Sequence, residues 1–258
     1  MRINAVSIKP NTFVSFKAHK PEVREASDIM RKAQTTFPMV SATRILTFYD
    51  VMNKPAQKKK LVDDIQEEIF LMRDEADFKR KLMDYSDNPY RAFVEGIHKR
   101  KKGNCLESAI IAAAGLYANG YSADVVSLYL NHSFINKKTG KVEYQEGAYL
   151  DHAFTVTNMG KKDTKIVLDP WFGFCGDWSE ISPKYHGCFD NDSKVIQYAD
   201  QNRDEFIKQL KKEYLPYDIS DYEERLGFSY RPLSLDVMNK DKVKQFFREN
   251  YPKLVLNA

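Results

Sequence analysis

The stretch that decides the fold is residues 103–120, which read GNCLESAIIAAAGLYANG. Its middle, 109–116, is an almost continuous apolar run, which predicts a helix buried on all sides. Asn104 is a favourable N-cap, and Glu107 follows at the spacing of a capping box. We therefore expect the helix to begin at Asn104, with Cys105 in its first turn, and to end at the Asn-Gly pair that closes the stretch.

Cys105 is thus predicted at a helix N-terminus, where unpaired N–H groups and the helix dipole favour a thiolate over a thiol. Residues 99–102, Lys-Arg-Lys-Lys, add positive charge just upstream. From this helix alone, a buried structural cysteine is an equally good interpretation, because free cysteines are usually buried. A nucleophilic cysteine also needs a base and an acceptor that orients the base.

A base and an acceptor follow on strands. Three short strands are predicted at 123–130, 152–157 and 165–169. His152 opens the second strand and Asp169 closes the third, 17 residues later. With a turn near Gly160, this spacing fits adjacent antiparallel strands that place the two side chains next to each other. Either residue alone has a structural alternative, but the ordered set predicts a triad of Cys105, His152 and Asp169.

The pattern along the chain predicts an α+β fold, with helices first, a buried central helix and then an antiparallel sheet. We divide the chain into an N-terminal tail or edge strand, a helical region and a catalytic core, at 1–20, 21–100 and 101–258. The core is expected to end in two helices, 200–215 and 240–250.

Composition excludes several classes of protein. The 258 residues carry 40 Lys+Arg and 36 Asp+Glu, a net charge of +4, which is too modest to indicate a nucleic-acid partner. No apolar run is long enough for a membrane span, and the first residues lack the apolar region of a secretory signal. We therefore expect a cytoplasmic protein. Three cysteines at wide spacing predict at least one free thiol rather than a disulfide framework.

A metal site is not expected either. Cys175, His186 and Cys188 lie within 14 residues, but they lack the close pairing of a structural zinc motif and a fourth ligand. We predict no metal and no other cofactor.

Three blocks of the sequence resemble the transglutaminase-like superfamily of papain-fold cysteine enzymes. Residues 103–126 are similar to the family's nucleophile helix, its glycine stop and the next strand. Residues 151–156 are similar to its histidine strand, and 166–171 to its aspartate strand, with an Asp-Pro step beside an aromatic residue. The resemblance implies a papain/transglutaminase-like core, in which a buried helix carrying the nucleophile packs on an antiparallel sheet.

The resemblance also implies a cysteine acyl-transfer enzyme that acts on amide bonds of proteins or peptides through a thioester. Hydrolysis by a protease, amidase or deamidase is favoured over the amine transfer of a transglutaminase, because cross-linking needs a site that excludes water. The family completes its oxyanion hole with a Trp or Gln side chain. The candidates here are Asn104, Trp171 and His98, beside the Cys105 backbone N–H.

Two alternatives stay open. One is a non-enzymatic descendant of the fold that binds a protein partner. The other is an arylamine-type N-acetyltransferase, which shares the order Cys, His, Asp; its Arg-Gly-Gly lead into the cysteine is absent here.

Overall fold

The structure, a computed structural model, describes residues 20–48, 55–82, 88–159, 165–177, 222–233 and 239–256. Its helices are α1 (Pro21–Thr36), α2 (Ala42–Phe48), α3 (Pro55–Leu82), α4 (Pro89–Arg100), α5 (Cys105–Ala118), α8 (Lys240–Asn250) and the 3-10 helix η3 (Pro252–Leu254). Its strands are β1 (Ala123–Asn136), β2 (Val142–Asn158), β3 (Lys165–Asp169), β4 (Phe174–Asp177) and β5 (Tyr222–Leu233). The fold is α+β, as predicted.

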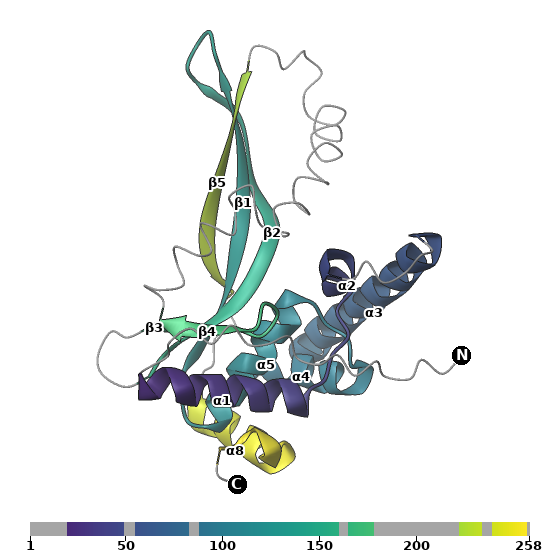
Figure 1. Ribbon diagram of the computed structural model, residues 1–258, viewed down its shortest axis with the longest axis vertical. Helices are drawn as coiled ribbons and strands as arrows, with labels where there is room; N and C mark the ends of the chain where they lie inside the picture. The colour runs from purple at the N-terminus through teal and green to yellow at the C-terminus, as the bar shows by residue number, and fades with distance from the viewer. Residues whose placement is uncertain are drawn as a thin grey trace.

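The strands form one sheet in the order β4-β3-β2-β1-β5, and each neighbouring pair is antiparallel. The helices gather around the lower part of the sheet, while β1, β2 and β5 continue upward as a narrow ribbon (Figure 1). β1 and β2 are longer than the predicted strands, and β5 was not predicted. The polar residues at 131–133 and 145–147 interrupt the alternation on which strand prediction depends.

The helix α5 is the centre of the core. Every residue from Glu107 to Ala118 is buried, which confirms the predicted all-round burial. Small side chains let α1 come close: a Cβ placed on Gly115 would lie 3.0 Å from Ile29 Cγ2 and 3.4 Å from Ala33 Cβ. α5 also packs against α4, α8 and the strands β1, β2 and β3. The helix therefore holds the helical layers and the sheet together.

One hydrophobic core crosses the division that we placed at residue 100. Ile29 of α1, Ile69 of α3 and Ile97 of α4 belong to the same cluster of buried residues as Ile110 of α5 and Leu168 of β3. The helical region 21–100 is thus packed into the body that carries the sheet.

Only some of the remaining predicted elements lie within the described residues. The helix predicted at 240–250 is present as α8, and the Asn239 side chain caps it by accepting the Lys242 N–H at 3.0 Å. The predicted helix 200–215 and the predicted tail, apart from Lys20, lie outside the described residues. None of the described helices combines the length and the apolar character that crossing a membrane requires.

Candidate active site

Cys105 is the first residue of α5, and its side chain is partly exposed. Glu107 Oε2 accepts the backbone N–H of Asn104 at 2.8 Å, the contact that the glutamate of a capping box makes. N–H groups in the first turn of a helix have no partner within the helix, and the Cys105 N–H is one of them. The predicted nucleophile therefore lies at the positive end of the helix dipole.

His152 and Asp169 lie on neighbouring antiparallel strands, as their spacing predicts. Thr155 and Leu168 form the last pair in the register of β2 with β3. Just beyond it, His152 Nε2 lies 2.6 Å from Asp169 Oδ2, with the side chains 3% and 0% exposed. The other carboxylate oxygen, Oδ1, accepts the Phe172 backbone N–H at 3.1 Å. Both oxygens of the buried carboxylate therefore have a donor.

The third predicted residue joins this pair. The Cys105 side chain shares a hydrogen bond with His152. Because Nε2 of the imidazole faces Asp169, Nδ1 is the ring nitrogen left for the thiol. The structure thus brings together Cys105 from α5, His152 from β2 and Asp169 from β3, in the order that a nucleophile, base and orienting acceptor require.

The charge of His152 depends on its two partners. Burial lowers the pKa of the imidazole, but the charge and hydrogen bond of Asp169, together with those of Cys105, outweigh burial and raise the pKa to about 10. At neutral pH the ring therefore carries a proton. The protonated imidazole places a positive charge beside the Cys105 side chain.

A β-bulge lies directly beside His152. Leu128 of β1 pairs with His152, but the next residue of β1, Tyr129, pairs with Leu150, so that Asp151 is left without a partner in β1. An extra residue twists a strand more strongly and changes the face to which its side chains point. The bulge therefore changes the strand geometry between the site and the ribbon. It was not predicted, because we expected a regular strand from 152 onward.

Aromatic rings surround the imidazole of His152. The ring centroid of Trp171 lies 5.5 Å away and that of Phe172 lies 5.1 Å away, both edge-on. Phe172 stacks in turn on Phe174, with their ring centroids 5.5 Å apart. Trp171 is buried, whereas Phe172 and Phe174 are partly exposed. These rings keep the His152–Asp169 pair out of water, which strengthens its electrostatic interaction.

Two of the three side chains considered for the oxyanion hole lie next to the triad. The Asn104 amide nitrogen donates to Gln66 Oε1 at 2.8 Å. The Trp171 indole N–H donates to the hydroxyls of Ser41 and Thr43, at 3.3 and 3.1 Å. In this structure both donors are therefore engaged with protein acceptors. The Cys105 backbone N–H stays the candidate oxyanion donor.

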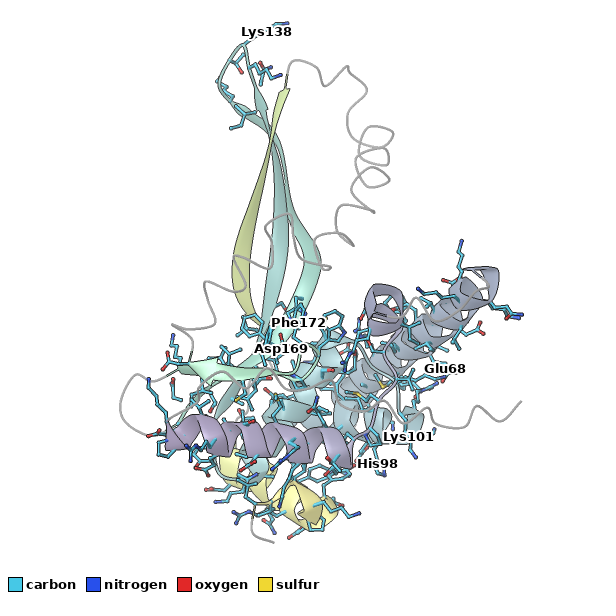
Figure 2. All side chains as sticks on the ribbon, in the orientation of Figure 1. Glu68, His98, Lys101, Lys138, Asp169 and Phe172 are labelled. Carbon is cyan, nitrogen blue, oxygen red and sulfur yellow. The ribbon has the colours of Figure 1, made fainter. Side chains whose placement is uncertain are left out.

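The third of these side chains, His98, lies elsewhere. It is exposed near the end of α4, and its ring contacts Phe37 and Tyr251, with centroids 5.9 and 5.6 Å away. Figure 2 shows His98 near the base of the molecule, well apart from Asp169 and Phe172.

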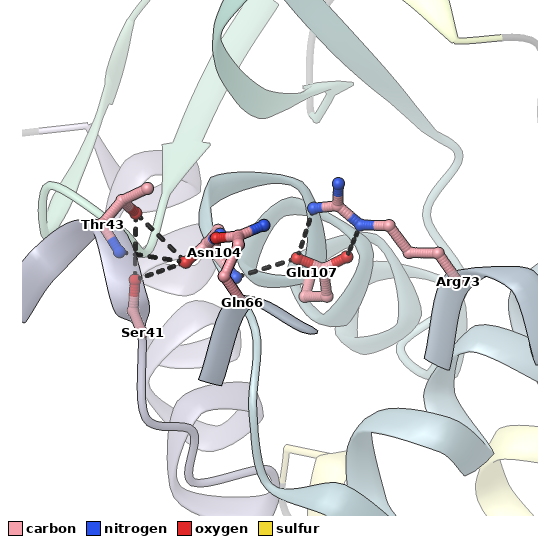
Figure 3. A network of polar contacts seen from close by, with 6 residues as sticks. All are labelled: Ser41, Thr43, Gln66, Arg73, Asn104 and Glu107. Atoms are coloured by element: carbon pink, nitrogen blue, oxygen red, sulfur yellow. Dashed lines mark hydrogen bonds and ion pairs between the residues drawn. The ribbon is translucent and has the colours of Figure 1, made fainter. Parts of the chain in front are cut away.

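The residues before 100 supply a polar network that sequence reasoning missed (Figure 3). Asn104 Oδ1 accepts the hydroxyls of Ser41 and Thr43, at 3.0 and 3.2 Å, and the Thr43 backbone N–H at 3.2 Å. On the other side, Arg73 of α3 donates to both carboxylate oxygens of Glu107, at 2.7 and 2.9 Å. Nothing in a single sequence links residues that are 34 to 63 positions apart.

The described residues offer no metal site. They contain no group of three or more His, Cys, Asp or Glu side chains arranged to hold an ion. Of the three residues considered for zinc, only Cys175 is described, and it lies on β4 with its Sγ 3.7 Å from the Val23 carbonyl oxygen. Burial raises the pKa of the Cys175 thiol to about 12. Cys175 lies on β4, outside the group formed by Cys105, His152 and Asp169.

Comparison of the chain with protein-family models, with curated proteins and with solved structures found no match.

Proposed function

We propose that this protein is a cysteine acyl-transfer enzyme with a papain/transglutaminase-like core, acting on amide bonds of proteins or peptides. The observation that carries the proposal is the buried His152, which is hydrogen-bonded to Asp169 through Nε2 and to Cys105 through its other side. The setting supports it, because the cysteine begins a buried helix packed on the sheet that holds the other two residues.

The reaction uses these atoms in turn. With the proton of Cys105 transferred to His152 Nδ1, the thiolate attacks the carbonyl carbon of an amide. The Cys105 N–H hydrogen-bonds the oxyanion that forms. The imidazolium then gives its proton to the leaving nitrogen, the C–N bond breaks, and the acyl group remains on Cys105 as a thioester. Asp169 holds the ring and stabilises its positive charge.

A second nucleophile completes the cycle. Water attacks the thioester carbon, His152 takes a proton from the water, and the thiol leaves with an acid as the product. If a primary amine attacks instead, the product is a new amide. We favour hydrolysis, because Cys105 is partly exposed and the site therefore admits water.

The test is incubation of the full chain with glutamine-containing peptides, with and without a primary amine, followed by mass spectrometry. Hydrolysis of the side-chain amide replaces ammonia by water, amine transfer adds the amine, and backbone cleavage gives two shorter peptides. The Cys105→Ala variant is the control for each product. No product, together with a Cys105 that alkylates no faster than a model thiol at neutral pH, would favour a non-enzymatic binding module.

A further inference from the structure

Arg73 and Glu107 form a two-point ion pair at the start of the nucleophile helix. Arg73 Nε donates to Glu107 Oε1 at 2.7 Å, and Nη2 donates to Oε2 at 2.9 Å. The Glu107 side chain is 0% exposed and that of Arg73 is 22% exposed. Breaking a buried pair by removing one partner leaves an uncompensated charge, so this contact constrains both helices strongly.

The same carboxylate reaches the residue before the nucleophile. Glu107 Oε2 accepts both the Arg73 guanidinium and the backbone N–H of Asn104, which lies 2.8 Å away. The position of Asn104 fixes that of the adjacent peptide group, which carries the Cys105 N–H. The geometry at Cys105 therefore depends on a side chain of α3, 32 positions upstream in the sequence.

The pair also sets the charge beside the thiol. Glu107 lies two residues after Cys105, and without a cation its buried carboxylate would oppose a thiolate. Burial lowers the pKa of Arg73, but the hydrogen bond and charge of Glu107 and the charge of Cys105 outweigh it and raise that pKa above its ordinary value. Arg73 thus attracts both negative groups.

Two of the four basic residues just upstream of Cys105, Arg100 and Lys102, pair with acids outside the site. Lys102 pairs with Glu68, and Arg100 pairs with Glu75 at 2.5 Å; both acids lie on α3. The charges of Arg73 from α3 and His152 from β2 interact with that of Cys105. Glu107 of the same helix binds Arg73, and Asp169 of β3 lies behind His152.

We propose that Arg73 is a positioning residue for the nucleophile: its two-point contact holds Glu107 and Asn104 in place, and its charge offsets the buried carboxylate that lies two residues from Cys105. This inference rests on the proposed role of Cys105. It assigns part of the helical region before residue 100 to the chemistry of the site.

The test is the rate of Cys105 alkylation by iodoacetamide as a function of pH, on the full chain, with the modified peptide identified by mass spectrometry. Arg73→Met should move the midpoint of the pH–rate curve up by about one unit, which slows alkylation about tenfold below the midpoint. Glu107→Gln should move the midpoint down. Arg73→Met combined with Glu107→Gln should return it toward the wild-type value.

Opposite shifts from the two single variants are the signature of the proposal, because a merely structural ion pair would lower stability in both and leave the midpoint alone. Arg80→Met is the matched control: Arg80 is on the same helix and pairs with Asp77 at 3.5 Å on the surface, and its loss should leave the curve unchanged. Should Arg73→Met fail to fold, Glu107→Gln and the double variant still carry the test.

The outcomes separate the two proposals. If wild-type Cys105 reacts no faster than a model thiol, the proposed function fails and this inference fails with it. If wild-type Cys105 is fast but the single variants shift the midpoint in the same direction or not at all, the role of Arg73 is wrong and that of Cys105 stands.

Discussion

The two ring nitrogens of His152 have different partners, and this difference fixes the proton that each can exchange. When the ring is neutral, Nε2–H donates to Asp169 Oδ2, and the Nδ1 lone pair is left to accept the proton of Cys105. The opposite tautomer would place a proton between the ring and the thiol and leave the carboxylate facing a lone pair. The carboxylate therefore selects the tautomer that can act as a base.

Replacing Asp169 by asparagine should lower turnover per folded molecule, and it should also lower stability, because the buried imidazolium of His152 loses its charged partner. An amide can orient the ring, but it can also rotate and favour the wrong tautomer, so we expect a loss of roughly ten- to a thousandfold, below the about ten-thousandfold loss in a serine triad. Turnover and melting temperature should be measured on the same sample. Asp177→Asn on the neighbouring strand, which breaks the pair with Lys20, is the control. A lower melting temperature with unchanged turnover would make Asp169 a structural residue only.

Replacing Cys105 by alanine should abolish turnover and change the melting temperature little, because a small, partly exposed side chain is lost from a helix start. Cys175→Ala is the matched control, since Cys175 is outside the triad and should retain turnover when folded. A Cys105→Ala variant that keeps more than a few per cent of wild-type turnover would exclude the proposed mechanism.

The raised pKa of His152 predicts a pH dependence of stability. Because the pKa is about 10 in the folded protein and about 6.5 in an unfolded chain, the folded state binds this proton more tightly. The resulting stabilisation is complete below pH 6.5 and is lost as the pH rises through 10. Chemical denaturation between pH 6 and 11 should show this loss in the wild type and a smaller one in Asp169→Asn. Identical curves would contradict the assignment of the imidazolium.

At the scale of elements, the helix that carries Cys105 and the two strands that carry His152 and Asp169 were predictable, because each is specified by neighbouring residues: a cap, an apolar run, an alternation. The bulge at Asp151 and the ribbon were not, since they depend on pairing between strands rather than on local pattern. The contacts of Arg73 with Glu107 are also set by tertiary packing alone.

The close packing around Gly103 leads to a prediction about the start of α5. A Cβ on Gly103 would lie 2.5 Å from Glu107 Cβ and 2.8 Å from Met39 Sδ, distances at which something must move. We expect Gly103→Ala to lower the free energy of unfolding by about 1–3 kcal/mol. It should also slow Cys105 alkylation, because a displaced Glu107 no longer holds Arg73 and the Asn104 N–H in place while its charge remains near the thiol.

Gly96→Ala serves as the control for that substitution. Its Cβ would meet Met72 Cγ at 2.8 Å, a comparable crowding between α4 and α3 that does not involve Glu107. It should change stability without changing the alkylation rate of the folded protein. Equal alkylation rates in the two glycine variants would show that the displacement of Glu107 has no effect on the nucleophile.

At the scale of the whole molecule, the sequence suggested a division at residue 100 because the texture changes there from amphipathic helices to an apolar helix. The packing does not follow this division. An apolar helix must be covered on every side, and the amphipathic helices before it supply part of that cover. A change of pattern between two segments can therefore mark two layers of one core rather than two domains.

A shared core predicts a single unfolding transition. Ile29→Ala removes a side chain that is 0% exposed and packs near Gly115, so we expect a loss of about 2–5 kcal/mol, felt equally by the helices and the site. Far-ultraviolet circular dichroism and Cys105 accessibility should report the same shifted midpoint. Leu71→Ala, at a side chain 48% exposed on α3, should have little effect. Two separate midpoints would instead support two domains that divide near residue 100.

The ribbon tip offers a point at which the molecule can be anchored. Lys138 lies there, in a turn closed by Asn136 Oδ1, which accepts its N–H at 2.9 Å (Figure 2). Eight residue steps along β1 lead from Leu128, the partner of His152, to Asn136, a span of about 26 Å at about 3.3 Å per step. The protein could be attached to a solid support at this tip through a group other than a cysteine thiol. Cys105 would then be held away from the support, and molecules attached at this one point would present the site in one orientation.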